Sequence, residues 1–146
     1  MKIRLIERRD RQQWDRLWQG YVDFYEATLS QDRTDLTWER FFDSTHVFKA
    51  FVAEIDDVIV GIAHAMLRQS TWESVGDMYL EDLFVAPSER AAGVGRALIE
   101  HVKQEAVAVG ASSLYWQTRE GNATARRLYD SITPKNDFIQ YSIKLI

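Results

Sequence analysis

One glycine-bearing stretch joins an apolar run to a long amphipathic run: Leu83-Phe84-Val85-Ala86-Pro87-Ser88-Glu89-Arg90-Ala91-Ala92-Gly93-Val94-Gly95-Arg96. The apolar run, residues 77–85, predicts a strand that Pro87 ends, because proline lacks the N–H that a strand ladder needs. The amphipathic run, residues 94–109, predicts a helix that ends at Gly110. Because the first N–H groups of a helix have no intrahelical partner, this arrangement predicts either an ordinary turn or an anion site.

The glycine spacing does not fit two common phosphate-binding motifs. A dinucleotide fingerprint needs a third glycine where this chain has Leu98. A P-loop needs Lys and then Ser or Thr where this chain has Arg96 and Ala97. A nucleotide-binding protein is therefore disfavoured, and the choice between a plain turn and a phosphate site of another kind stays open.

The remaining periodicities predict an α/β fold. Further strands are expected at 2–7, 48–55, 58–67, 113–118 and 138–145, and further helices at 10–28, 37–42 and 122–130. Asp56-Asp57 predicts a tight hairpin turn between two of the strands. The order β-α-α-β-β-β-α-β-α-β ends in two β-α-β passages, which indicate parallel pairing near the C-terminus.

Composition narrows the class of protein. The 146 residues are 46% hydrophobic, which predicts one globular domain over residues 1–146. A net charge of −4 argues against a nucleic-acid partner, and no run of apolar residues is long enough to predict a membrane span. The chain has no cysteine, which excludes a thiolate nucleophile and fits a cytoplasmic setting. The spacing of the three histidines predicts no metal site.

Three motifs of the chain resemble those of the GNAT superfamily of N-acetyltransferases. The first is Arg90-x-x-Gly93-x-Gly95, which resembles the acetyl-CoA pyrophosphate motif of that family. The second is Asn122-x-x-Ala125-x-x-Leu128-Tyr129, downstream of a predicted strand. The third, Tyr79-Leu80-Glu81-Asp82, is similar to the start of the corresponding strand in spermidine/spermine acetyltransferases and their bacterial relatives.

The resemblance implies a GNAT fold and an acetyl-CoA site. The fold would be a mixed, mostly antiparallel sheet of 6–7 strands with about four helices and a splayed pair of parallel strands that holds CoA. The backbone of Leu83, Phe84 and Val85 would pair with the pantetheine arm, and Asn122 and Ala125 would bind the arm from the other side. The pyrophosphate would lie against residues 90–96, namely Arg90, Ala91, Ala92, Gly93, Val94, Gly95 and Arg96.

The resemblance also implies two catalytic side chains for direct acetyl transfer to an amine. Tyr129 would protonate the leaving thiolate, and Glu81 would accept the amine proton through water, because a strand carboxylate in a half-buried cleft can have a raised pKa. Asp82 would help to bind a cationic amine. Strand alternation places Glu81 and Asp82 on opposite faces, unless a bulge intervenes.

The acceptor is expected to be a small cationic amine such as a polyamine. From 69 to 89 the charged residues are all acidic, so this region would attract a cation: Glu73, Asp77, Glu81, Asp82 and Glu89. Two alternatives stay open, an acetyltransferase for a protein or peptide amine and a non-catalytic CoA-binding sensor. By family analogy, a strand at Phe138–Leu145 could also form a homodimer interface.

Overall fold

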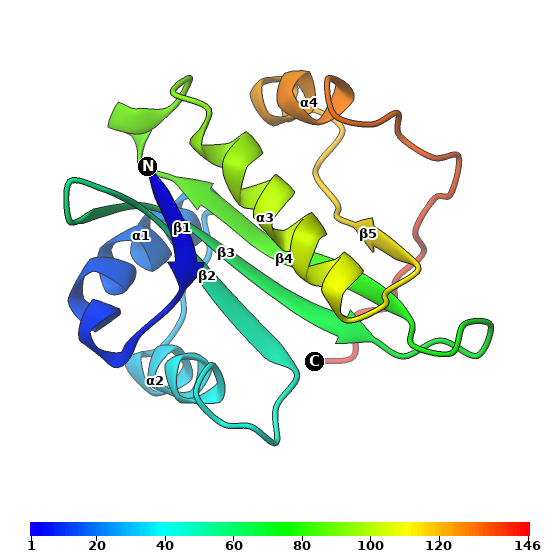
Figure 1. The fold of residues 1–146 in the computed structure, drawn as a ribbon, viewed down its shortest axis with the longest axis horizontal. Helices are drawn as coiled ribbons and strands as arrows, with labels where there is room; N and C mark the ends of the chain where they lie inside the picture. The colour runs from blue at the N-terminus through cyan, green and yellow to red at the C-terminus, as the bar shows by residue number, and fades with distance from the viewer. The chain divides into compact units, whose positions relative to one another are not determined.

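Five strands form one mixed sheet in the order β1-β2-β3-β4-β5 (Figure 1). The computed structural model describes all residues from Met1 to Ile146. The strands are β1 (Lys2–Leu5), β2 (Phe48–Ile55), β3 (Val58–Arg68), β4 (Asp77–Val85) and β5 (Ser113–Tyr115). The first four pair in antiparallel fashion, and β5 joins β4 in parallel.

Helices cover both faces of this sheet (Figure 1). On one face, α1 (Arg11–Phe24) and α2 (Gln31–Arg40) bury an aromatic-rich core. This core includes Trp14, Leu17, Trp18, Val22, Trp38, Ala50, Val52, Ile62 and Phe84. On the other face lies α3 (Val94–Ala108), whose buried stripe contains Val94, Leu98, Ile99, Val102 and Ala106.

A glycine in β3 lets α3 approach the sheet closely. A Cβ atom at Gly61 would lie 2.9 Å from Val94 Cγ1 and 3.0 Å from Leu98 Cδ1. Those distances are shorter than van der Waals contact, so glycine is required for the first turn of α3 to seat on β3. The start of α3 is thereby held at the end of β4, where the glycine-bearing stretch lies.

An ion-pair cluster holds the start of the chain to the sheet. Arg4 of β1 contacts the carboxylate of Asp10 at 2.7 and 3.0 Å and that of Glu54 of β2 at 2.6 Å. Asp10 closes the short 3₁₀ helix at Arg8–Asp10 and is only 3% exposed. A carboxylate this deeply buried needs a paired cation and hydrogen-bond donors, and here it also accepts the N–H of Glu7 at 2.7 Å.

The contacts divide the chain into two compact units, Met1–Trp116 and Gln117–Ile146. The first unit contains the whole sheet and α1 to α3, and the second contains α4 (Ala123–Asp130). None of the helices has the length and apolar composition that crossing a bilayer would need.

Most of the expected elements are confirmed. The α3 helix ends within one residue of the prediction, and the Asp56-Asp57 turn has φ of +49° and +63°, as a two-residue hairpin requires. The helix expected at 37–42 begins earlier, at Gln31, where the Ser30 hydroxyl accepts the N–H of Arg33 at 3.2 Å and caps it.

Two expectations about strands are wrong. The sheet has five strands where 6–7 were expected, and Phe138–Leu145 forms no strand. Alternating apolar residues give a local preference, but a strand also needs a neighbour that accepts its backbone hydrogen bonds. Phe138, Tyr141 and Ile143 are each at least 85% exposed, so no sheet surface buries them.

Candidate active site

The outer edge of β4 has a strand partner only along its first three residues. Strand β5 pairs with β4 only at Asp77, Met78 and Tyr79, opposite Ser113, Leu114 and Tyr115. From Leu80 to Val85 no strand lies beside β4 on that side. This edge can pair with an extended ligand, in the manner of an added strand.

Beyond Val85 the chain forms a turn that presents the N-terminus of α3. A 3₁₀ helix at Pro87–Glu89 leads to Gly93, the N-cap of α3, which has φ of +80°. No side chain caps this end, and the first intrahelical bond is donated by the Ala97 N–H to Gly93 O at 3.0 Å. The N–H groups of Val94 and Gly95 precede that bond, so they and the helix dipole favour an anion here.

Gly93 is required for its conformation and not for lack of space. A Cβ at this position would meet no atom within 4 Å, but an L-residue at φ +80° is strained. Ala91 adopts φ of +74° in the same loop, so the loop carries a second left-handed residue without a glycine. Strain of this kind is retained where the surrounding structure fixes it, and it gathers at ligand sites.

Arg90 folds back over the end of β4. Its Nε–H donates to Val85 O at 3.3 Å, and its guanidinium lies 5.5 Å from the centre of the Phe84 ring. Gly20 of α1 lets that ring approach, since a Cβ there would lie 2.9 Å from the Phe84 ring. The ring of Phe84 at the end of β4 thus contacts both α1 and the guanidinium of Arg90.

A β-bulge in β4 sets the direction of its two acidic side chains. His64 of β3 pairs with Asp82, but Ala65 pairs with Leu80, so Glu81 is the extra residue. Across the bulge, Asp82 shares the α1 face with His64, whereas Leu80 lies on the α3 face. Simple alternation along β4 is therefore broken at this point: Asp82 lies opposite His64, and Glu81 has no partner in the register.

Acidic and phenolic groups gather around the bulge. Burial raises the pKa of Glu81, and the charge of the neighbouring Asp82 raises it further. Burial also raises the pKa of Tyr79, with Glu81 as the next cause. The pKa of Tyr21 is raised by burial and by the charge of the Asp82 carboxylate. Two carboxylates beside aromatic rings form an environment that favours a cationic amine.

The side chain of Asp82 is fixed from the core. Its Oδ2 lies 2.9 Å from Nδ1 of His64, whose Nε2 lies 3.0 Å from the indole nitrogen of Trp14. His64 and Trp14 are both almost completely buried. Sequence reasoning placed no function on Trp14, because a tryptophan on an apolar helix face predicts only core packing.

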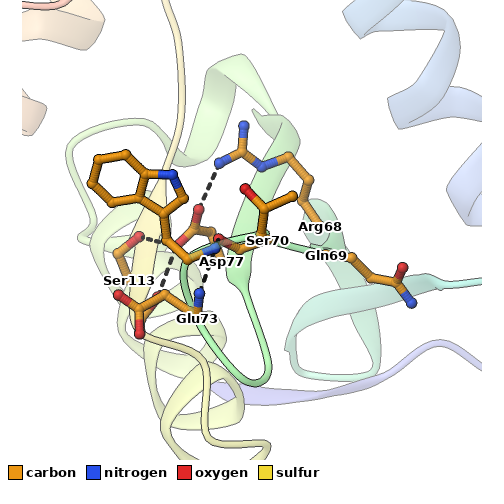
Figure 2. Close-up of a pocket in the computed structure, with 9 residues that line it drawn as sticks. Arg68, Gln69, Ser70, Glu73, Asp77 and Ser113 are labelled. Atoms are coloured by element: carbon orange, nitrogen blue, oxygen red, sulfur yellow. Dashed lines mark hydrogen bonds and ion pairs between the residues drawn. The ribbon is translucent and has the colours of Figure 1, made fainter.

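A separate pocket lies at the other end of β4 (Figure 2). Its lining comes from the β3–β4 loop and the start of β5, namely Arg68, Gln69, Ser70, Thr71, Trp72, Glu73, Asp77, Ser112 and Ser113. Asp77 accepts from Arg68 at 2.6 Å, from Ser112 at 2.8 Å and from Ser113 at 2.9 Å, and these contacts lower its pKa. The negative charge of Asp77 is thus balanced within the pocket, which leaves Glu81 and Asp82 as the unbalanced acids of β4.

The other predicted site residues belong to the second unit. Asn122 caps α4, where its Oδ1 accepts the Ala125 N–H at 3.4 Å and its Nδ2 donates to Thr118 Oγ1 at 3.2 Å. Tyr129 lies on the same helix, one turn beyond Ala125, and is half-buried. The motif residues Asn122, Ala125 and Tyr129 therefore share one short, side-chain-capped helix.

An unpaired β4 edge beside an uncapped helix N-terminus is the arrangement expected of an acyl-CoA transferase. The chain belongs to the GNAT acetyltransferase family, because residues 14–132 match the model of that family. The protein is accordingly an N-acetyltransferase of the acetyl-CoA-dependent kind.

Known relatives agree with this assignment. The D-amino-acid N-acetyltransferase HPA3 of Saccharomyces cerevisiae is 33% identical over 142 residues, which cover 95% of this chain and 88% of the relative. An aminoglycoside N(6')-acetyltransferase type 1 of Salmonella typhimurium is 27% identical, with 90% of each chain covered. The chain is also similar to a thialysine N-epsilon-acetyltransferase of Bos taurus, at 30% identity over 62% of this chain and 58% of that one.

Solved structures share the fold. An aminoglycoside acetyltransferase from an uncultured soil metagenomic sample, in complex with trehalose, superposes with a TM-score of 0.84 at 20% identity, over 99% of this chain and 96% of that one. The aminoglycoside N-acetyltransferase AAC(6')-Iy in complex with CoA gives a TM-score of 0.77 at 21% identity, over 99% and 100% of the two chains.

Proposed function

We propose that the protein transfers an acetyl group from acetyl-CoA directly to a primary amine of a small cationic acceptor, such as a polyamine. The observation that carries this proposal is the pair of carboxylates at the β4 bulge, Glu81 and Asp82, beside the phenols of Tyr21 and Tyr79. Relatives named for D-amino acids, thialysine and aminoglycosides support an amine acceptor. The family match spans both compact units, so we propose that they act as one transferase domain.

The donor side of the proposal uses the end of β4 and the start of α3. The free edge at Leu83, Phe84 and Val85 fits the amide-bearing pantetheine arm, whose hydrogen bonds would match those of an adjacent strand. The uncapped N-terminus of α3 fits the pyrophosphate, which the loop from Arg90 to Arg96 would surround. Asn122 and Ala125 would contact the arm from α4.

In the proposed reaction, Glu81 and Tyr129 each carry out one proton transfer. Glu81 takes a proton from the ammonium, so that the amine lone pair can bond to the acetyl carbonyl carbon. The carbon–sulfur bond then breaks, and the Tyr129 hydroxyl gives its proton to the departing thiolate. The raised pKa of Glu81 supports its role, because a base with an ordinary glutamate pKa is too weak to take a proton from an ammonium near neutral pH.

A thiol-release assay tests the proposed function. The full-length protein with acetyl-CoA is screened against spermidine, a D-amino acid, an aminoglycoside and a lysine-bearing peptide. Faster release with the polyamine than with the D-amino acid or the peptide is expected. If only the peptide is acetylated, the acceptor is a protein amine and not a small molecule. Thiol release with none of the four acceptors would refute acetyl transfer to these amine classes.

We also propose that the chain forms a homodimer through its C-terminal segment. Its exposed apolar residues recur with a period of two and would be covered by a second copy: Ile139, Tyr141, Ile143 and Leu145. A variant that ends at Asp137 should be monomeric by light scattering, whereas the full chain should have twice its own mass. A monomeric full chain would refute this assembly.

A further inference from the structure

His64 occupies a site where a polar ring must have both nitrogens satisfied. The side chain is 2% exposed and lies in the middle of β3, between α1 and β4. Its ring contacts the aromatic rings of Trp18 at 5.3 Å and Phe41 at 4.7 Å between centroids. A buried imidazole in such apolar surroundings would be costly unless each nitrogen had a hydrogen-bond partner.

The partner of Nε2 decides which nitrogen carries the proton. Nε2 lies 3.0 Å from Nε1 of Trp14, and an indole nitrogen can only donate. Nε2 must therefore accept, and the ring proton must sit on Nδ1. Trp14 thus selects the tautomer of His64 by hydrogen-bond chemistry.

The proton on Nδ1 faces the carboxylate of Asp82. Nδ1 and Asp82 Oδ2 are 2.9 Å apart, and the two residues lie directly opposite in the β3–β4 register. The Asp82 side chain is 14% exposed, and its charge helps to raise the pKa of the Tyr21 phenol. A carboxylate has about four acceptor positions, so the His64 donor orients Asp82 and leaves positions for a further donor.

We propose that His64, oriented by Trp14, is a positioning residue that holds the Asp82 carboxylate toward the acceptor amine. This inference rests on the proposed function, because the further donor is taken to be the acceptor ammonium. The bulge makes the arrangement possible, since it places Asp82 and not Glu81 in register with His64. Asp82 then serves as the fixed anion that binds the amine, and Glu81 as the group that takes the proton.

Nitrogen NMR of the ring tests the tautomer without any need for activity. The chain has three histidines, so His46→Asn and His101→Asn variants assign the signals. In the wild-type protein, the His64 ring should show a protonated Nδ1 and an unprotonated Nε2. A His64 ring protonated on Nε2 alone would overturn the proposal, because Trp14 could not then donate to it.

Kinetics with spermidine as the acceptor test the positioning role. His64→Leu removes the donor to Asp82 and should raise the KM for spermidine by about tenfold or more, since a hydrogen bond to a charged group is lost. The KM for acetyl-CoA should not change. His64→Asn places an amide N–H near the position of Nδ1 and should recover most of the loss. An unchanged spermidine KM in His64→Leu would overturn the role of His64 alone.

Trp14→Phe provides a second test if His64→Leu does not fold. This variant keeps an aromatic ring in the core but removes the indole N–H, so the His64 ring should lose its single tautomer and the spermidine KM should rise. His101→Asn is the matched control, because His101 packs on Phe51 from α3 and does not contact β4 acids. If the wild-type protein acetylates no amine, the proposed function is refuted. An active protein whose spermidine KM is unchanged in the variants would refute only the role of His64.

Discussion

The rings of Tyr79 and Tyr115 stack with centroids 4.8 Å apart at the last residue pair that joins β4 to β5. The guanidinium of Arg68 lies over the Tyr115 ring, 5.3 Å from its centre. Strand β5 has only three residues, so its ladder contributes few hydrogen bonds. The stacked rings therefore hold β5 at the point beyond which the β4 edge is unpaired.

Replacement of Tyr115 by alanine is expected to destabilise this attachment. Loss of the stack and of the half-buried ring should lower the free energy of unfolding by about 1–3 kcal/mol, measured by urea denaturation. Tyr115→Phe keeps the ring and should remain near the wild-type value. Equal stability of the alanine and phenylalanine variants would mean that the stack contributes nothing.

Gly93→Ala should weaken CoA binding through backbone strain and not through a steric clash. The added Cβ meets no atom within 4 Å, but the left-handed φ of +80° costs an L-residue about 1–2 kcal/mol. If the loop relaxes to avoid that strain, CoA affinity in calorimetry should fall by about tenfold. Gly121→Ala is the matched control, since its Cβ also meets nothing and its φ is ordinary. Equal CoA affinities in the two variants would contradict the role of the Gly93 conformation.

Ala91→Gly tests the same loop in the opposite direction. Ala91 has φ of +74°, which glycine adopts without the steric cost. Relief of this strain, less the extra entropy of an unfolded glycine, should raise the free energy of unfolding by about 0.5–1 kcal/mol. A lower stability in urea denaturation would show that the surrounding loop depends on the alanine side chain.

Glu81→Gln should lower the activity and raise the stability of the protein at pH 7. As the proposed base, Glu81 must be ionised, so the acid limb of kcat/KM should lie above the ordinary glutamate value of 4.5, and the variant should lose about 100-fold or more in kcat. Because the folded-state pKa is raised, wild-type stability falls as pH rises from that value through the raised one. The neutral glutamine avoids this loss, so the variant should be more stable than wild type at pH 7 and lose its advantage near pH 4.

Glu73→Gln is the control for both readouts. Glu73 is an exposed acid in the β3–β4 loop, outside the group of residues at the bulge. It should leave kcat and the pH dependence of unfolding as in wild type. A Glu81→Gln variant with the kinetics of this control would remove Glu81 from the mechanism.

Tyr129→Phe should slow the reaction without loss of the donor. The phenol proton is lost while the ring is kept, so kcat should fall by about 100-fold or more and CoA affinity should stay near wild type. Tyr141→Phe, at a residue that is 88% exposed, is the matched control. Full turnover by Tyr129→Phe would require another acid for the thiolate.

Sequence periodicity predicted the elements that depend on local pattern. The stripe of Val94, Leu98 and Val102 defined α3 because each helical turn buries one of these residues. The Asp56-Asp57 hairpin followed from turn chemistry that those two residues carry by themselves. The glycine turn was likewise expected from the residues around Gly93, whereas the splayed edge of β4 was expected only from the resemblance to the GNAT family.

Features that depend on distant partners were not predictable in this way. The bulge at Glu81 inserts one residue without any change in composition, so counting could not decide which acid faces α1. The Trp14–His64 hydrogen bond joins residues 50 positions apart, and neither residue alone indicates it. The alternation at Phe138–Leu145 predicted a strand, but it contained no information on whether a neighbouring strand would be present.

The extra residue at Glu81 also divides β4 into two segments whose side chains alternate independently of each other. On one side of it the residues with odd numbers face α1, and on the other side those with even numbers do. A substitution at Tyr79 therefore leaves the alternation of Leu83, Phe84 and Val85 unchanged. Under the proposed function, the choice of amine could then change independently of the site for the acetyl donor.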